Sequence, residues 1–177
     1  METKEVLPVV DEIGNVIGKV ARGKCHFNPV EKILHPVVHL HVFNSRGELF
    51  LQHRAMTKKI QAGKWDTSVG GHISFGEDIL QSLKREAEEE IGLSSFKSVL
   101  IKKYIWETDA EKELVYMFAC LTDINLKVNP EEISEGRFWE IEEIRKNLGK
   151  NVFTGNFEKE FLIIEESFIS VELLLTQ

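Results

Sequence analysis

The spacing of hydrophobic residues changes several times along the chain, and each spacing predicts a different element. Short blocks in which apolar residues alternate with polar ones or run together, bounded by turn-forming residues, are typical of strands. Such blocks occupy 6–10, 16–21, 36–43, 48–52, 97–106, 114–121 and, shorter, 136–139. The turn formers at 11–15 predict that the first two blocks pair as an N-terminal ribbon.

Within 36–43, alternation predicts that Val38, Leu40 and Val42 lie on one face of the strand and His39 and His41 on the other. A histidine on a strand is more often a hydrogen-bonded structural residue than a ligand. Neither histidine is therefore expected in a functional site.

Apolar residues three or four positions apart predict three helices. In the longest, Leu80, Leu83, Ala87 and Ile91 share the side that is expected to face a core, and Gly92 is the expected helix stop. Two shorter patterns follow, one at Ile141, Ile144 and Leu148 and one at Phe157, Phe161, Ile164 and Phe168. Strands interleaved with helices predict an α/β (α+β) fold with a mixed sheet covered on both faces.

Beside its apolar side, the longest helix carries a group of acids. At 100° per residue, Glu86, Glu89 and Glu90 fall within an arc of about 100°. Their mutual repulsion costs a few tenths of a kcal/mol, which a hard cation with oxygen ligands would turn into a gain. Periodicity alone leaves open the alternative of a solvated acidic surface.

Composition narrows the classes of partner. The chain has 177 residues, 42% of them hydrophobic, which fits one domain with a core of ordinary size. A net charge of −7 argues against a nucleic-acid polymer or an anionic membrane as partner. Cys25 and Cys120 are expected as reduced thiols, and with no targeting or membrane-spanning pattern the expected location is cytoplasmic. The oligomeric state stays open, with a homodimer as one option.

The loop 53–65 concentrates cations in this acidic chain. A basic loop that leads directly into an acidic helix suits a metal-bound diphosphate, although ordinary surface lysines are the alternative. Arg54 is expected to donate hydrogen bonds to two phosphate oxygens at once, and Lys58 is expected to contribute a flexible positive charge.

The stretch GHISFGEDILQSLKREAEEEIGL, residues 71–93, decides between the alternatives for the acidic helix. Its fixed positions are Gly71, Glu77, Arg85, Glu86, Ala87, Glu89, Glu90, Gly92 and Leu93, and their spacing resembles the Nudix box without a mismatch. The resemblance implies Mg²⁺-dependent hydrolysis of a nucleoside diphosphate linked to another group. It also implies an α/β/α sandwich over 34–168, with an N-terminal extension at 1–33 packed on it and a tail at 169–177.

The same resemblance implies roles for individual residues. Glu86, Glu89 and Glu90, with Gly71, would hold Mg²⁺ or, alternatively, Mn²⁺, and one of these glutamates or the nearby Glu113 would activate water. Glu77 and Arg85 would pair. The substrate would be a small phosphorylated metabolite, held by Arg54, Lys58 and His72.

A narrower resemblance connects features outside the box to the Nudix branch of type I isopentenyl-diphosphate isomerases. In those enzymes a cation is held at positions that match His26, His35, His72, Glu111 and Glu113. The spacing of His26 departs from the pattern, and Gly70 stands where the isomerases have a catalytic cysteine. Glycine has no thiol that could act as the acid in isomerisation, so hydrolysis is the favoured reaction. Isomerisation and nucleotide sensing without turnover remain the alternatives.

Overall fold

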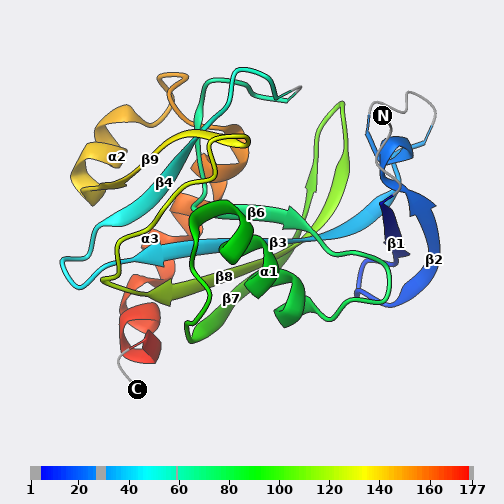
Figure 1. Ribbon diagram of the computed structural model, residues 1–177, viewed down its shortest axis with the longest axis horizontal. Coiled ribbons are helices and arrows are strands. Elements are labelled where there is room, and N and C mark those ends of the chain that lie inside the picture. The colour runs from blue at the N-terminus through cyan, green and yellow to red at the C-terminus, as the bar shows by residue number, and fades with distance from the viewer. Residues whose placement is uncertain (1–4, 27–30, 59, 176–177) are drawn as a thin grey trace.

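A mixed sheet of seven strands forms the centre of the molecule (Figure 1). This computed structural model describes residues 5–26, 31–58 and 60–175, with side chains up to 167. β3 and β8 pair in parallel, and the other paired strands of the sheet that the structure describes are antiparallel. The strands are β3 (Leu34–Phe43), β4 (Leu49–Arg54), β5 (Trp65–Asp66), β6 (Val69–His72), β7 (Ser98–Glu107), β8 (Lys112–Leu121) and β9 (Ile133–Trp139).

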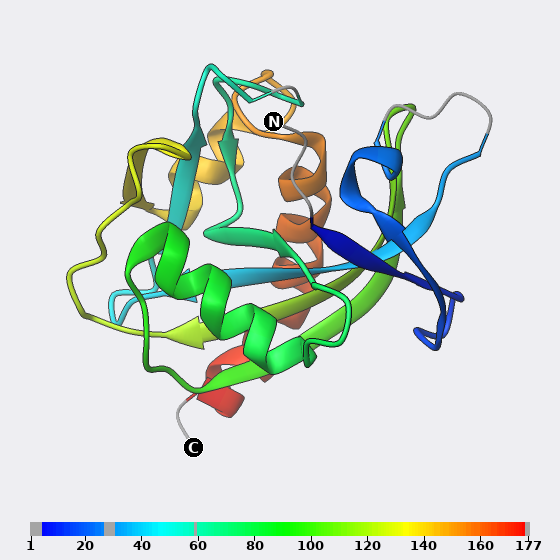
Figure 2. The same ribbon diagram turned by 45° about the vertical axis from the view of Figure 1, so that its right-hand side comes forward.

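Helices cover the two faces of this sheet, as Figure 2 shows. α1 (Ile79–Ile91) packs on one face, and α2 (Ile141–Asn147) and α3 (Gly155–Leu175) pack on the other. Each face has its own hydrophobic core, because successive side chains of a strand point to opposite sides. The expected α/β fold is confirmed. α3 continues past 168, and the side chain of Phe168 lies outside the described residues.

Local signals set the ends of α1. The Asp78 side chain accepts hydrogen bonds from the first helical N–H groups, Gln81 completes the capping box, and Gly92 ends the helix in the left-handed conformation at φ 69°. One expectation about this helix was wrong: Leu80 is half exposed, at 50%, although Leu83, Ala87 and Ile91 are buried as expected. In the first turn Ile79, and not Leu80, packs against the core. The buried side of the helix there is therefore one residue away from the expected position.

The N-terminal ribbon consists of β1 (Val6–Val10) and β2 (Val16–Ala21), as the sequence predicted. Leu7 and Val10 are buried, and the Phe75 N–H donates to the Val6 carbonyl, so the ribbon is attached just before α1. A short 3-10 helix, η1 (Arg22–Lys24), follows. Among the helices that the structure describes, none is long and apolar enough to cross a membrane.

Candidate metal and substrate site

A fork in the sheet creates the candidate site. β3 pairs with β4 only at Val42 and Phe43; before that point its antiparallel neighbour is β6. Ser68 bridges the strands at the fork, because its hydroxyl accepts from the Val42 N–H and donates to the Phe50 carbonyl. A cavity of about 610 Å³ opens here, lined by residues that flank the ribbon, such as Glu5 and Arg22, and by residues of the sheet and α1.

Two glutamates of α1 form the acidic wall of this cavity. Glu90 is buried, and its Oε2 accepts from the Gln52 amide at 3.0 Å and from the Gly70 N–H at 3.2 Å. Neither donor is charged. Burial, and then repulsion from Glu86, raises the pKa of Glu90 to about 8, and burial also raises the pKa of Glu86. These are carboxylates for which a bound cation would be strongly favourable.

Glu89 lies differently from the other two acids of the group. Its side chain is 59% exposed, although it also lines the cavity. Arg85 is placed between the acids: its Nη1 donates to Glu86 at 2.8 Å and to Glu89 at 3.3 Å. Arg85 also donates two bonds of 2.9 Å to Glu77, which is the pairing that the resemblance implied. Arg85 therefore connects the loop before α1 to the acidic side of the helix.

The donor set fits Mg²⁺. Hard divalent cations prefer carboxylate oxygens, and Glu86 and Glu90 present two of them to a cavity large enough for water and substrate oxygens. The glycine at position 71 is consistent with this metal site, because a Cβ there would overlap the Glu86 carboxyl group. The glycine is needed for Glu86 to occupy this position.

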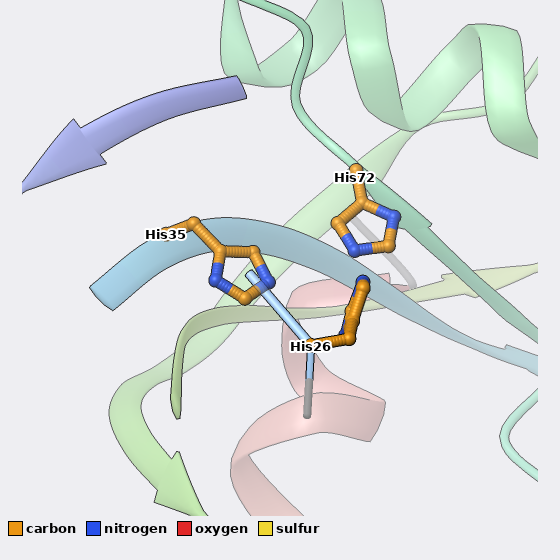
Figure 3. Close-up of side chains that lie close together, drawn as sticks. All are labelled: His26, His35 and His72. Atoms are coloured by element: carbon orange, nitrogen blue, oxygen red, sulfur yellow. The ribbon is translucent and has the colours of Figure 1, made fainter. Parts of the chain in front are cut away.

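A second cluster lies at the ribbon side of the cavity, where His26, His35 and His72 come together (Figure 3). Each offers one ring nitrogen, and these three atoms lie within 4.8 Å of one another. The Nε2 atoms of His35 and His72 are buried and have no hydrogen-bond partner among the described residues. Burial lowers the pKa of both rings, so both are neutral near pH 7 and can act as ligands.

Two acids complete this cluster. Glu111 Oε2 lies 2.9 Å from His26 Nδ1, and Glu113 Oε1 lies 3.9 Å from His35 Nε2. His35 and Glu113 are direct partners across the parallel pair of β3 and β8. The side chains of all five residues named by the narrower resemblance are thus assembled, including His26 despite its spacing. Imidazole nitrogens with carboxylates are a donor set that suits Mn²⁺ or Zn²⁺.

The two cations chosen from the loop line the cavity but already have partners. Arg54 Nη1 donates to Asp66 at 2.9 Å, and Lys58 Nζ donates to Glu132 at 3.0 Å. Both side chains are partly exposed, so substrate oxygens could replace these partners without loss of a deeply buried bond.

Two acids in or near the site were missed from the sequence: Glu132, which lines the cavity, and Glu160, which does not. Glu132 lies before β9 and faces the acidic helix, because the Asn129 N–H binds the Glu90 carbonyl at 2.8 Å and holds this loop against α1. Nothing local in the loop marks it. Glu160 is fully buried on α3. An acid at the helical spacing of Phe157, Phe161 and Ile164 was a signal that could have identified it.

Comparison with known proteins agrees with this architecture. Residues 33–161 match the model of the NUDIX domain. The chain is 29% identical over 131 residues to an uncharacterised Nudix hydrolase of Yersinia pestis, covering 74% of this chain and 70% of that protein. It is 30% identical over 154 residues to isopentenyl-diphosphate Delta-isomerase 1 of Photorhabdus laumondii, covering 83% of this chain and 86% of that protein.

A solved structure shows the same fold. The crystal structure of DR0079 from Deinococcus radiodurans superposes with a TM-score of 0.73 at 21% identity, covering 91% of this chain and 98% of that one. The matched domain includes the sheet, α1 with its acidic wall and most of the cavity. The chain described here belongs to the Nudix family.

Proposed function

We propose that this protein hydrolyses a diphosphate bond in a nucleoside diphosphate derivative or a similar small phosphorylated metabolite, with Mg²⁺ at Glu86 and Glu90. The observation that carries the proposal is the acidic wall itself. One buried carboxylate, Glu90, and one partly buried carboxylate, Glu86, face one cavity; Glu90 has only neutral hydrogen-bond donors, and Gly71 leaves the space that Glu86 needs.

Different residues of the cavity would have different roles in this reaction. Mg²⁺ would neutralise charge on the phosphoryl group and acidify a bound water. Glu86 and Glu90 would hold the ion, with the exposed Glu89 as a further ligand or as the base that accepts the proton of the attacking water. Arg54 and Lys58 would exchange Asp66 and Glu132 for substrate oxygens.

The histidine cluster supports a second cation in the same cavity. His26, His35 and His72 would be its nitrogen ligands, and Glu111 and Glu113 its oxygen ligands. Because the cluster and the acidic wall line one cavity, a cation here would contact a different part of the same substrate.

The second candidate function is isopentenyl-diphosphate isomerisation, which the assembled histidine cluster favours. That reaction protonates a carbon atom and needs a proton donor at the cavity wall. Gly70 offers none. Hydrolysis, which needs a metal-bound water, remains the better match to the residues present.

A substrate panel tests the proposal. Phosphate and nucleotide release is measured with and without Mg²⁺ for nucleoside diphosphates and triphosphates, nucleotide sugars, dinucleotides and isopentenyl diphosphate, with allylic product followed by NMR. We expect Mg²⁺-dependent cleavage that Glu90→Gln lowers at least 100-fold. Glu88→Gln, an exposed acid of the same helix, is the matched control. Allylic product without cleavage would favour the isomerase, and equal cleavage by both variants would refute the metal assignment.

A further inference from the structure

A buried hydrogen-bond network lies on the face of the sheet opposite α1. Its centre is the carboxylate of Glu160 on α3, which is fully buried. Glu160 Oε1 accepts from His39 Nδ1 at 2.9 Å and from the Tyr104 hydroxyl at 2.7 Å, and Oε2 accepts from His41 Nε2 at 2.9 Å. The two strand histidines that the sequence left aside are therefore held by one acid.

This network fixes the orientation of the His39 ring. An ionised carboxylate only accepts hydrogen bonds, so Nδ1 of His39 carries a proton and donates this hydrogen bond to Glu160. The other nitrogen, Nε2, has no hydrogen-bond partner among residues 5–26, 31–58 and 60–167, although the His39 residue is only 8% exposed. The ring is thus held at one end and free at the other.

The free end of the ring lies at the cavity wall. His39 and Gly70 are cross-strand partners of β3 and β6, and both line the cavity. A Cβ at Gly70 would lie 3.5 Å from His39 Nε2 and 3.4 Å from its Cδ2. Because Gly70 has no side chain, the space in front of Nε2 stays open to a ligand.

Charge favours an anionic ligand at this point. Burial alone would lower the pKa of His39, but Glu160 raises it to about 9, with smaller contributions from Glu113 and Asp66. His39 is therefore an imidazolium near pH 7, and its Nε2–H is a charged donor. Because His39 lines the cavity, this charged donor is accessible there, and an oxygen of a bound anion can accept a strong hydrogen bond from it.

We propose that His39 is a further substrate-binding residue, whose Nε2–H donates a hydrogen bond to an anionic oxygen of the substrate's diphosphate beside Gly70. Glu160 is the positioning residue that orients the ring. The inference rests on the proposed function for the identity of the ligand. It adds a protein cation on the side of the sheet opposite the acidic wall, so that the diphosphate would be held between a metal and an imidazolium.

Binding of methylenediphosphonate, a diphosphate analogue that is not hydrolysed, tests the proposal by calorimetry in the presence of Mg²⁺. His39→Asn keeps an amide near Nδ1 but removes the Nε2 donor, and we expect it to weaken binding at least tenfold. His39→Gln restores a neutral donor near Nε2 and should recover part of the affinity. His53→Asn, outside the cavity, is the matched control and should bind as wild type does.

A second measurement observes the wild-type His39 ring directly. In ¹⁵N NMR spectra of the wild-type protein, the His39 Nε2–H signal should shift when methylenediphosphonate is added, and Glu160→Gln should reduce that shift. With a cleavable substrate, His39→Asn should raise KM more than it lowers kcat. Unchanged analogue affinity in a folded His39→Asn variant, or an unmoved His39 signal at saturation, would overturn the inference.

The outcomes separate this inference from the proposed function. If Glu90→Gln abolishes hydrolysis and His39→Asn binds the analogue normally, the hydrolase stands and the role of His39 is refuted. If no substrate is cleaved but His39→Asn still loses the analogue, the diphosphate site at His39 stands and the hydrolase is refuted.

Discussion

Gly71 lies directly against the carboxyl group of Glu86, so that no side chain fits between β6 and the acidic wall of α1. A Cβ at this position would overlap Glu86 Cδ, Cγ and Oε1. The first glycine of the box is therefore required because it lets the strand approach closely the glutamate that is expected to bind the metal.

Gly71→Ala should displace the Glu86 carboxylate and weaken Mg²⁺ binding by roughly 10–100-fold, the range found when the support of a metal ligand is disturbed. Calorimetric titration with Mg²⁺ measures this loss. Gly18→Ala on the ribbon is the matched control, since a Cβ there makes only ordinary contacts of 3.7 Å. Unchanged Mg²⁺ affinity in Gly71→Ala would show that Glu86 does not bind the ion.

The histidine cluster predicts a second metal-binding site in each chain. Titration of the wild-type protein with Mn²⁺ should reveal two sites per chain, and His72→Ala should leave one. His72 is chosen because its buried Nε2 has no other partner among the described residues. His53→Ala should retain both sites. One site in wild type and His72→Ala alike would mean that the cluster binds no metal.

The pair of Glu77 and Arg85 predicts how stability depends on pH. The Arg85 hydrogen bonds lower the pKa of Glu77 from 4.5 to about 2 in the folded state. The unfolded chain binds this proton more readily, so the stabilisation is complete above about pH 4.5 and is lost as the pH falls towards 2. Glu77→Gln should cost about 1–2 kcal/mol at pH 7, after allowance for solvent screening, and progressively less below pH 4.5.

Urea unfolding of both proteins between pH 7 and pH 3 measures this difference. Glu88→Gln, at an exposed position of α1, should show no comparable change. A difference between wild type and Glu77→Gln that grows as the pH falls would contradict the assignment.

The aromatic core beneath α3 predicts a large packing effect. Phe157 is fully buried, with its ring centroid 5.1 Å from that of Phe153 and 5.9 Å from that of Phe161. Phe157→Ala should lower the free energy of unfolding by about 3–5 kcal/mol, because it leaves a cavity in a packed core. Leu162→Ala, 54% exposed on the same helix, is the control and should change stability by less than about 0.5 kcal/mol. Chemical denaturation of both variants measures the effect.

The sequence carried the information that is local or periodic. Alternation placed the ribbon at Val6–Val10 and Val16–Ala21, and the spacing of Leu83, Ala87 and Ile91 placed the buried side of α1. The box spacing identified Glu86 and Glu90 as neighbours, because residues four apart on a helix share a side. These features depend on chain geometry within one element.

Only the tertiary structure decided which distant residues meet. Glu160 lies 121 positions from His39, and Glu111 lies 85 positions from His26. Periodicity put His39 and His41 on one strand face but could not show what packs on that face. The parallel pairing of β3 with β8 and the docking of α3 supply the partners, since contacts between elements depend on the register and packing of the whole sheet.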